Sequence, residues 1–182
     1  MAWDSGLTTK DYLMAIIKSV RGFTPKFGNN CFFAENAVVV GEVTMGDNCT
    51  VWFNAVVRGD VHSIVIGDNT NIQDGAVIHC TYQKAKTIIG SNVSIAHNAI
   101  VHGCTVEDNV LIGMGSIIMD GAVIGNNSVI AAGAIILPGT LVESGSMYAG
   151  NPAKRMKDIS DEMREVIQRT AENYPMYAEW FK

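Results

Sequence analysis

Residues 106–142 read VEDNVLIGMGSIIMDGAVIGNNSVIAAGAIILPGTLV, and an aliphatic residue stands at every sixth position of this stretch. A small or β-branched residue follows most of these anchors by four positions. A six-residue period fits neither an α-helix nor an alternating strand. It is typical of a parallel β-helix, in which each hexad supplies one short strand and three hexads close one triangular coil. The anchors are Val106, Ile112, Ile118, Ile124, Ile130, Ile136 and Val142.

The same period continues upstream, with three breaks in its count. Three extra residues follow Val57, five extra residues follow Ile78, and the step after Val101 is one residue short. Because the period resumes after each break, we expect the extra residues to bulge outward as loops. Insertions in repeat proteins gather on one face, often the functional one. The upstream anchors are Met45, Val51, Val57, Ile66, Ile72, Ile78, Ile89, Ile95 and Val101.

The period divides the chain into three parts. Residues 1–18 are predicted to be an N-terminal extension, a short helix or a tail. Residues 19–150 are predicted to form the β-helix, which ends at Gly150-Asn151-Pro152 because proline cannot donate a ladder hydrogen bond. In residues 151–182 we expect a helix with Ser160 as its N-cap, packing back along the coil. The predicted fold is therefore all-β with one C-terminal helix.

The composition excludes several classes of protein. With 182 residues, 48% apolar and 17% charged, the chain is expected to form one ordered domain. The net charge of −5 gives no reason to expect nucleic acid as a partner. The sequence has neither a membrane-spanning apolar run nor a basic region followed by an apolar stretch, so we expect a cytoplasmic protein without a membrane partner. The cysteines form no CxxC pair and are interpreted as buried, reduced thiols: Cys31, Cys49, Cys80 and Cys104.

The repeat places two histidines on one edge of the triangular prism. His79 directly follows an anchor on the third edge, and His102 directly follows the equivalent anchor one coil higher. Their side chains should therefore stack about 4.8 Å apart, close enough to share a metal ion. By the same count, Arg58 lies one coil below His79.

His97 occupies a different edge. It follows its anchor by two residues, and five residues of extended chain with a corner separate it from His102, on the order of 15 Å at about 3.3 Å per residue. A zinc–nitrogen bond is only about 2.0–2.1 Å long. His97 can therefore bind the same metal only from a second chain. A closed three-fold ring would create three identical sites at subunit interfaces.

Gln73 and Asp74 fall near the edge that carries His97. Asp74 lies one coil below His97, and across a trimer interface it would face Arg58 of the neighbour. A buried guanidinium requires a carboxylate, so an ion pair there is physically reasonable. The alternative is that Gln73 and Asp74 are only turn residues in the segment Gln-Asp-Gly.

Taken together, these motifs resemble those of the γ-class carbonic anhydrase family, over nearly all of residues 20–180. The resemblance implies a left-handed coil and a homotrimer with a metal at each interface. It also implies that His79 and His102 come from one subunit and His97 from the next. The motifs are Arg58-Gly59-Asp60, Asn71-Ile72-Gln73-Asp74-Gly75, His79 and His97-x4-His102-Gly103.

The resemblance also implies roles for further residues. Arg58, Asp60 and Asp74 match positions that build the interface in this family. Gln73 matches a position that hydrogen-bonds the metal-bound solvent, and Tyr148 matches a place where some members have a tyrosine near the site. The implied activity is the reversible hydration of CO2 to bicarbonate by a metal-bound hydroxide. Zn2+ would serve, and Fe2+ or Co2+ fits an imidazole site as well.

The chain departs from the most active members of the family at two places. Val61 stands where those members have a glutamate, and the loop over residues 80–86 has no acidic residue, although such acids export the proton. We therefore expect weak hydration. His62 is a conceivable substitute, although an exposed loop histidine without a role is the more usual interpretation.

Two other functions remain open. A hexapeptide acyltransferase that uses acyl-CoA shares this coil and the Gly-Asn-Pro-Ala ending at 150–153, but it needs one histidine as general base and no metal. A metal-dependent thioesterase or a non-catalytic trimer would retain the scaffold without hydrating CO2. Metal analysis separates the acyltransferase from the others.

Overall fold

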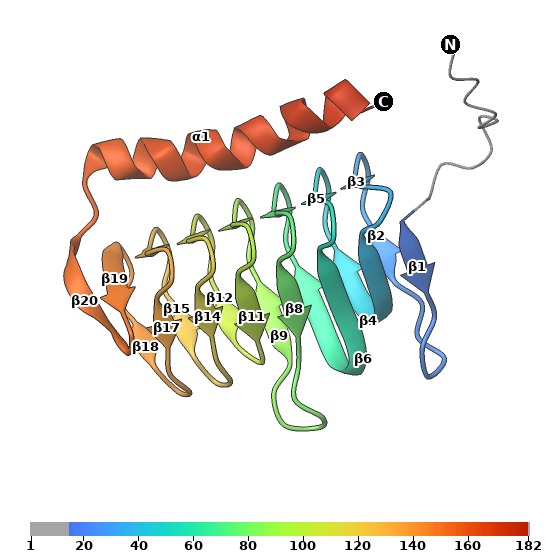
Figure 1. The fold of residues 1–182 in the computed structure, drawn as a ribbon, viewed down its shortest axis with the longest axis horizontal. Coiled ribbons are helices and arrows are strands. Elements are labelled where there is room, and N and C mark those ends of the chain that lie inside the picture. Colours follow the sequence, from blue (N-terminus) through green and yellow to red (C-terminus); the bar gives the residue numbers. More distant parts are fainter. Residues whose placement is uncertain (1–14, 182) are drawn as a thin grey trace, which may run out of the picture.

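The computed structural model describes residues 15–181, which form a three-sided β-solenoid with one helix lying along it (Figure 1). Equivalent strands of successive coils pair in parallel. Ile72 pairs with Ile95, and Ile78 pairs with Val101, as the count of hexads predicts. The predicted solenoid of hexapeptide repeats is therefore confirmed.

The second face of the prism is one sheet. Eight strands of the described chain form it, in the order β20-β19-β16-β13-β10-β7-β5-β3. Only the pairing of β19 with β20 is antiparallel among these strands. The strands are β3 (Phe32–Phe33), β5 (Thr50–Val51), β7 (Asn71–Ile72), β10 (Ser94–Ile95), β13 (Leu111–Ile112), β16 (Val129–Ile130), β19 (Ser146–Gly150) and β20 (Ala153–Asp158).

The first and third faces are joined into a second sheet, which contains twelve of the described strands. Strand β6 connects them because one of its ends pairs with β8 and the other with β9. The strands are β1 (Ile16–Lys18), β2 (Lys26–Phe27), β4 (Val38–Met45), β6 (Val56–Ile66), β8 (Val77–His79), β9 (Thr87–Ile89), β11 (Ile100–His102), β12 (Thr105–Val106), β14 (Ile117–Ile118), β15 (Val123–Ile124), β17 (Ile135–Ile136) and β18 (Leu141–Val142).

The predicted anchors fill the interior of the prism. Those from Met45 to Ile136 are at most 2% exposed. Burying each isoleucine side chain stabilises the fold by roughly 1.5–3 kcal/mol, so these stacked columns are the main source of stability. The thiols of Cys49, Cys80 and Cys104 are buried as predicted, whereas Cys31 is only partly buried.

Six asparagines turn the chain at the corner between the first and second faces. Their φ angles lie between 53° and 57°, in the left-handed region that asparagine tolerates better than most residues. Their side-chain amides stack between coils; Asn69 Nδ2, for example, donates to Asn92 Oδ1 at 3.2 Å. We call this set the asparagine ladder: Asn30, Asn48, Asn69, Asn92, Asn109 and Asn127.

All three breaks of the period lie at one corner, between the third and first faces. We call residues 58–63, 79–87 and 102–104 the break corner. The extra residues after β8 protrude as the predicted loop between β8 and β9 (Figure 1). Those after Val57 do not: residues 60–63 stay within β6 and oppose the single residue Glu42 of β4. The expectation of a loop was wrong here because β4 runs around the same corner and keeps its ladder with β6 as a bulge.

The two ends of the solenoid differ from the predicted boundaries. Residues 16–18, assigned to the extension, form β1 and pair with residues 38–40 of β4. The rest of the predicted extension, residues 1–14, lies outside the described residues. Beyond residue 150 the chain first forms β20, whose mostly exposed residues carry no six-residue period.

The helix α1 (Asp161–Ala178) then runs along the second face and contacts β5, β7 and β10, as predicted (Figure 1). Ser160 Oγ accepts a hydrogen bond from Met163 N at 3.3 Å, which confirms the predicted N-cap. A short 3-10 helix, η1 (Glu179–Phe181), follows. Within residues 15–181, no helix has the length and apolarity required to cross a membrane.

Candidate metal centre

His79 and His102 lie side by side at the break corner. They end strands β8 and β11 and are paired in register. Nδ1 of His79 is 3.1 Å from Nε2 of His102, so the predicted stacking of the two imidazoles is observed. Sequence counting alone was sufficient to bring these two side chains together.

A carboxylate faces the other ring nitrogen of each histidine. Asp60 Oδ1 is 3.0 Å from His79 Nε2, and Asp120 Oδ1 is 2.6 Å from His102 Nδ1. Ionised carboxylates only accept hydrogen bonds, so the ring proton of each neutral histidine is assigned to the nitrogen that faces the carboxylate. The lone pairs of the remaining two nitrogens then point toward each other.

This donor set fits a metal ion. Two lone pairs that face each other at 3.1 Å repel unless a proton or a cation lies between them. Two nitrogens bound tetrahedrally at about 2.0–2.1 Å from zinc are about 3.3 Å apart, close to the spacing of this pair. The carboxylates behind the rings are the partners that usually fix the tautomer of a metal-binding histidine.

The charges at the centre favour the neutral, metal-binding form of His79. Burial lowers the pKa of His79 below its ordinary value, although the hydrogen bond to Asp60 opposes the shift. For Asp60, burial acts to raise the pKa, but hydrogen bonds from His79 and from Arg58 outweigh it and lower the pKa. Arg58 Nη1 lies 2.6 Å from Asp60 Oδ2. Asp60 is therefore ionised while the imidazole beside it is uncharged at neutral pH.

Thr87 holds the two histidine strands together. Its side chain is fully buried; its hydroxyl donates to the His79 carbonyl at 2.5 Å and accepts from Gly103 N at 3.0 Å. Gly103 has a φ of +56° and makes the short turn after His102.

Replacing Thr87 by valine should lower the free energy of unfolding by about 1–3 kcal/mol, because it removes two buried hydrogen bonds of about 0.5–1.5 kcal/mol each and leaves the His79 carbonyl and the Gly103 amide only their hydrogen bond to each other. Urea unfolding of the metal-free protein measures this loss. The matched control is Thr105→Val, one coil higher and half-buried, which should change stability by about 0.5 kcal/mol or less. Equal stabilities of the two variants would contradict the role of the Thr87 hydroxyl.

His97 has a carboxylate partner of its own, away from this pair. It follows β10, and its Nδ1 lies 3.0 Å from Asp74 Oδ2, one coil below. Asp74 is thus placed under His97 as the sequence predicts. Within residues 15–181 of the single chain, no three His, Cys, Asp or Glu side chains are grouped to hold a metal ion.

Gln73 points outward from the second face and is nevertheless buried, at 4% exposed. Its Nε2 donates to Asn71 Oδ1 at 3.0 Å, and Asn71 Nδ2 donates to Ser94 Oγ at 2.8 Å. This chain of hydrogen bonds fixes the amide next to Asp74. Gln73 is therefore more than a turn residue, since its side chain is buried and held in place.

Tyr148 does not lie near the histidines of its own chain. Tyr148 lies on β19 and pairs with Ile130 of β16. Three inter-strand spacings, about 14 Å, separate Tyr148 from Ile95, the anchor that precedes His97 by two residues. The Tyr148 ring belongs to the buried core. The expectation that Tyr148 stands near the site is thus not met within the chain, because its position on β19 continues the inward-facing column of anchors.

Val61 and His62 lie in the bulge of β6, beside Asp60. All three line a small hollow of about 140 Å3. His62 Nδ1 accepts from Ser63 N at 2.8 Å, so the proton of the neutral ring is assigned to Nε2. The bulge, and not a loop, therefore places Val61 and His62 beside Asp60.

Asp120 is a site residue that sequence reasoning missed. It lies one coil above His102, but it follows its anchor, Ile118, by two residues, while His79 and His102 follow theirs by one. The count of anchors that paired the histidines therefore places Met119, and not Asp120, directly above His102.

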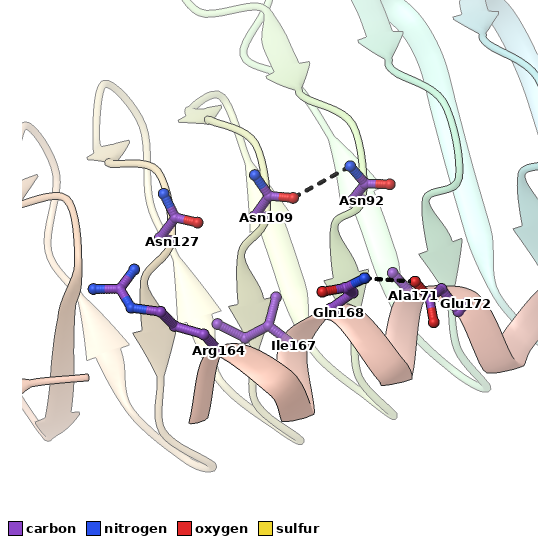
Figure 2. A pocket seen from close by; sticks show the side chains of 8 residues that line it. All are labelled: Asn92, Asn109, Asn127, Arg164, Ile167, Gln168, Ala171 and Glu172. Carbon is purple, nitrogen blue, oxygen red and sulfur yellow. Dashed lines mark hydrogen bonds between the residues drawn. The ribbon is translucent and has the colours of Figure 1, made fainter. Parts of the chain in front are cut away.

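A hollow of about 380 Å3 lies between α1 and the asparagine ladder (Figure 2). Asn92 and Asn109 are hydrogen-bonded to each other there, as are Gln168 and Glu172. It lies at the corner between the first and second faces, away from the break corner, so its residues do not contribute to the histidine pair.

Comparison with known proteins gives a consistent family. A family model described as bacterial transferase hexapeptide (six repeats) matches residues 24–59 and 103–138, and one described as the hexapeptide repeat of succinyl-transferase matches residues 86–118. A protein named probable carbonic anhydrase from Methanocaldococcus jannaschii is 48% identical over 150 residues, 82% of this chain and 94% of that protein.

A carbonic anhydrase of Geobacillus kaustophilus is 37% identical over 92% of this chain and 91% of its own. Among solved structures, a hexapeptide transferase family protein from Anaplasma phagocytophilum has a TM-score of 0.88 at 38% identity, covering 92% of this chain and 98% of that one. Gamma carbonic anhydrase 2 of Arabidopsis thaliana is 38% identical over 83% of this chain and 56% of that protein. The repeat models and these relatives show that the chain belongs to the γ-carbonic-anhydrase-like family of hexapeptide-repeat proteins.

Proposed function

We propose that this protein is a metal-dependent enzyme that hydrates CO2 to bicarbonate at sites shared between the subunits of a homotrimer. The observation that carries the proposal is the pair of imidazole nitrogens, 3.1 Å apart, each ring backed by a carboxylate. Relatives named carbonic anhydrase support the same reaction.

His79 and His102 of one subunit and His97 of the next would hold the ion. When bound, a divalent ion with imidazole ligands supplies a water whose pKa falls to about 7 and which is therefore nucleophilic at neutral pH. Zn2+ suits three imidazoles, and Fe2+ or Co2+ suits them as well. Asp74 would orient His97 as Asp60 orients His79, since each carboxylate contacts a ring nitrogen of its histidine.

The surrounding residues have separate tasks. Arg58 is held by Asp60 and would pair through its remaining N–H groups with Asp74 of the neighbouring subunit. Gln73 precedes Asp74 and would accompany His97 to the shared site, where its amide would be placed to hydrogen-bond the attacking oxygen. The break corner must also release one proton per turnover, because CO2 and water give bicarbonate and H+.

The test is element-resolved metal analysis together with stopped-flow CO2 hydration. Protein purified without oxygen or chelator should hold about one metal ion per chain. Chelation should abolish hydration, and readdition of metal should restore it. Metal-free protein that transfers acyl groups from acyl-CoA would instead establish the acyltransferase function. Metal-replete protein without hydration would indicate another substrate, such as a thioester, or a non-catalytic trimer.

Replacing Val61 by glutamate should raise the turnover number for hydration, by about 10²-fold where proton release is fully limiting. The carboxylate would stand beside Asp60, at the hollow that His62 also lines, and would carry the proton to buffer. Hydration rates at several buffer concentrations measure this effect. Val61→Gln is the matched control, because it has the same size and cannot titrate. Equal rates for both variants at low buffer would contradict a limit set by proton release.

A further inference from the structure

Asp120 binds two partners with its two oxygens. One oxygen accepts from His102 Nδ1 at 2.6 Å, and the other accepts from the hydroxyl of Thr81. Thr81 belongs to the inserted loop after β8, and Asp120 follows β14. One carboxylate therefore joins the loop, the histidine and the next coil.

The backbone around Asp120 is fixed on both sides. Gly121 N donates to the Gly103 carbonyl at 2.7 Å, and Gly139 N donates to the Asp120 carbonyl at 2.9 Å. Asp120 is thus tied to the turn that follows His102 below it and to the coil above it. The position of its carboxylate does not depend on the side chain of His102.

We propose that Asp120 is a positioning residue that holds the proton of His102 on Nδ1 and thereby keeps Nε2 bare toward His79, while Thr81 fixes the carboxylate. The part of this role that concerns metal rests on the proposed function. The tautomer of His102 is a property of the metal-free chain.

The chemistry of the contact supports this role. The Asp120 carboxylate accepts from His102 Nδ1 with one oxygen and from the Thr81 hydroxyl with the other. A carboxylate cannot donate to the imidazole, so it excludes the tautomer with the proton on Nε2. That other tautomer would direct N–H at the shared point and block a metal.

Asp120 differs from the carboxylate behind the other histidine of the pair. Asp60 divides its charge between His79 and the guanidinium of Arg58. The second oxygen of Asp120 accepts from a neutral hydroxyl, so no cation at that contact competes with His102 for its charge. At this contact the negative charge of Asp120 therefore faces the His102 imidazole without a competing cation.

The first test needs no metal. Ring nitrogen chemical shifts of His102, measured by NMR in chelated protein at neutral pH, should report a proton on Nδ1 in the wild type. Asp120→Asn keeps the shape of the side chain, but its amide can donate a hydrogen bond to His102 Nδ1. The tautomer with the proton on Nε2 should therefore become more populated, as when asparagine replaces the aspartate of other histidine–carboxylate pairs. An unchanged tautomer in both Asp120→Asn and Asp120→Ala would overturn the proposal.

The second test uses Zn2+ itself. Asp120→Asn should weaken zinc affinity by about 10–100-fold, measured by competition with a coloured chelator. Thr81→Val should weaken it less, because the carboxylate remains. Asp108→Asn is the matched control: Asp108 also accepts a hydrogen bond from another coil, at Ser91 N, but lies at the corner with the asparagine ladder. It should leave zinc affinity unchanged.

The two tests separate this inference from the proposed function. If the wild-type protein binds no zinc, the proposed metal site is contradicted. The tautomer of His102 then still tests whether Asp120 positions the proton. If the wild-type protein, Asp120→Asn and Asp108→Asn all bind zinc equally well, only the proposed role of Asp120 is contradicted. Thermal unfolding of the metal-free variants distinguishes both results from a loss of fold.

Discussion

Replacing His97 by alanine is expected to remove metal from every site of the protein, although His97 contacts neither His79 nor His102 within its own chain. The pair at the break corner supplies only two nitrogens, and a zinc site in a catalytic protein has three protein ligands. Metal stoichiometry by elemental analysis measures the loss. Retention of a full complement of metal by His97→Ala would exclude it as a ligand.

Mixing variants tests whether sites are shared. When His97→Ala and His102→Ala subunits are exchanged in equal amounts, about one quarter of the sites in a closed three-fold ring should combine an intact pair with an intact His97. Metal content should therefore rise from near zero to about that fraction. Mixing His79→Ala with His102→Ala is the control: both residues come from the same side of the interface, so no site is restored. Recovery in the control, or none in the test mixture, would contradict the shared geometry.

Replacing Gly41 by alanine is expected to destabilise the protein strongly and to disturb Asp60. Gly41 has a φ of +80°, and a Cβ built on it would lie 2.2 Å from the Gly59 carbonyl oxygen and 3.0 Å from Asp60 N. The atoms that the added Cβ would meet belong to the backbone of β6 and cannot rotate away, so the paired strands β4 and β6 must move apart at the bulge. Overpacking of this kind costs about 1–3 kcal/mol, in addition to the cost of the left-handed conformation.

The comparison with Gly22→Ala isolates the contribution of the contact. Gly22 has nearly the same φ, +82°, and nothing lies within 4 Å of a Cβ built there. Urea unfolding of the metal-free variants should show Gly41→Ala to be less stable than Gly22→Ala by about 1–3 kcal/mol. Zinc affinity should fall only in Gly41→Ala, since the shift of β6 displaces Asp60 from His79. Equal stabilities would show that φ alone, and not the close approach of β4 to β6, requires glycine at position 41.

The sequence predicted the coil and the histidine pair because register in a solenoid is discrete. A strand displaced by one residue would turn its anchor out of the core, so the six-residue count allows only one register between neighbouring coils. Ile78 and Val101 had to pair, and with them His79 and His102. Three imidazoles converging between chains, and the left hand of the coil, stay predictions that rest on the family.

Other elements could not be predicted because the period does not describe them. The residues on both sides of the bulge in β6 pair with β4. The length of β4 follows from this pairing and not from the pattern of apolar residues in β4 itself. Strand β20 is mostly exposed and has no apolar signature. Asp120 acts through a side chain that reaches down one coil, and a count of anchors gives the level of a residue but not the direction of its side chain.

All three breaks of the six-residue period lie at the break corner, together with the histidine pair. The number of coils in the solenoid is therefore independent of the geometry of that pair. The coils from β12 onward repeat without insertion, and only Asp120 among their residues reaches the histidine pair. A spacer of one whole coil, added above Gly139, would lengthen the prism by about 4.8 Å and leave the chemistry where it is. The scaffold can therefore grow by whole coils at its C-terminal end without moving the histidine pair.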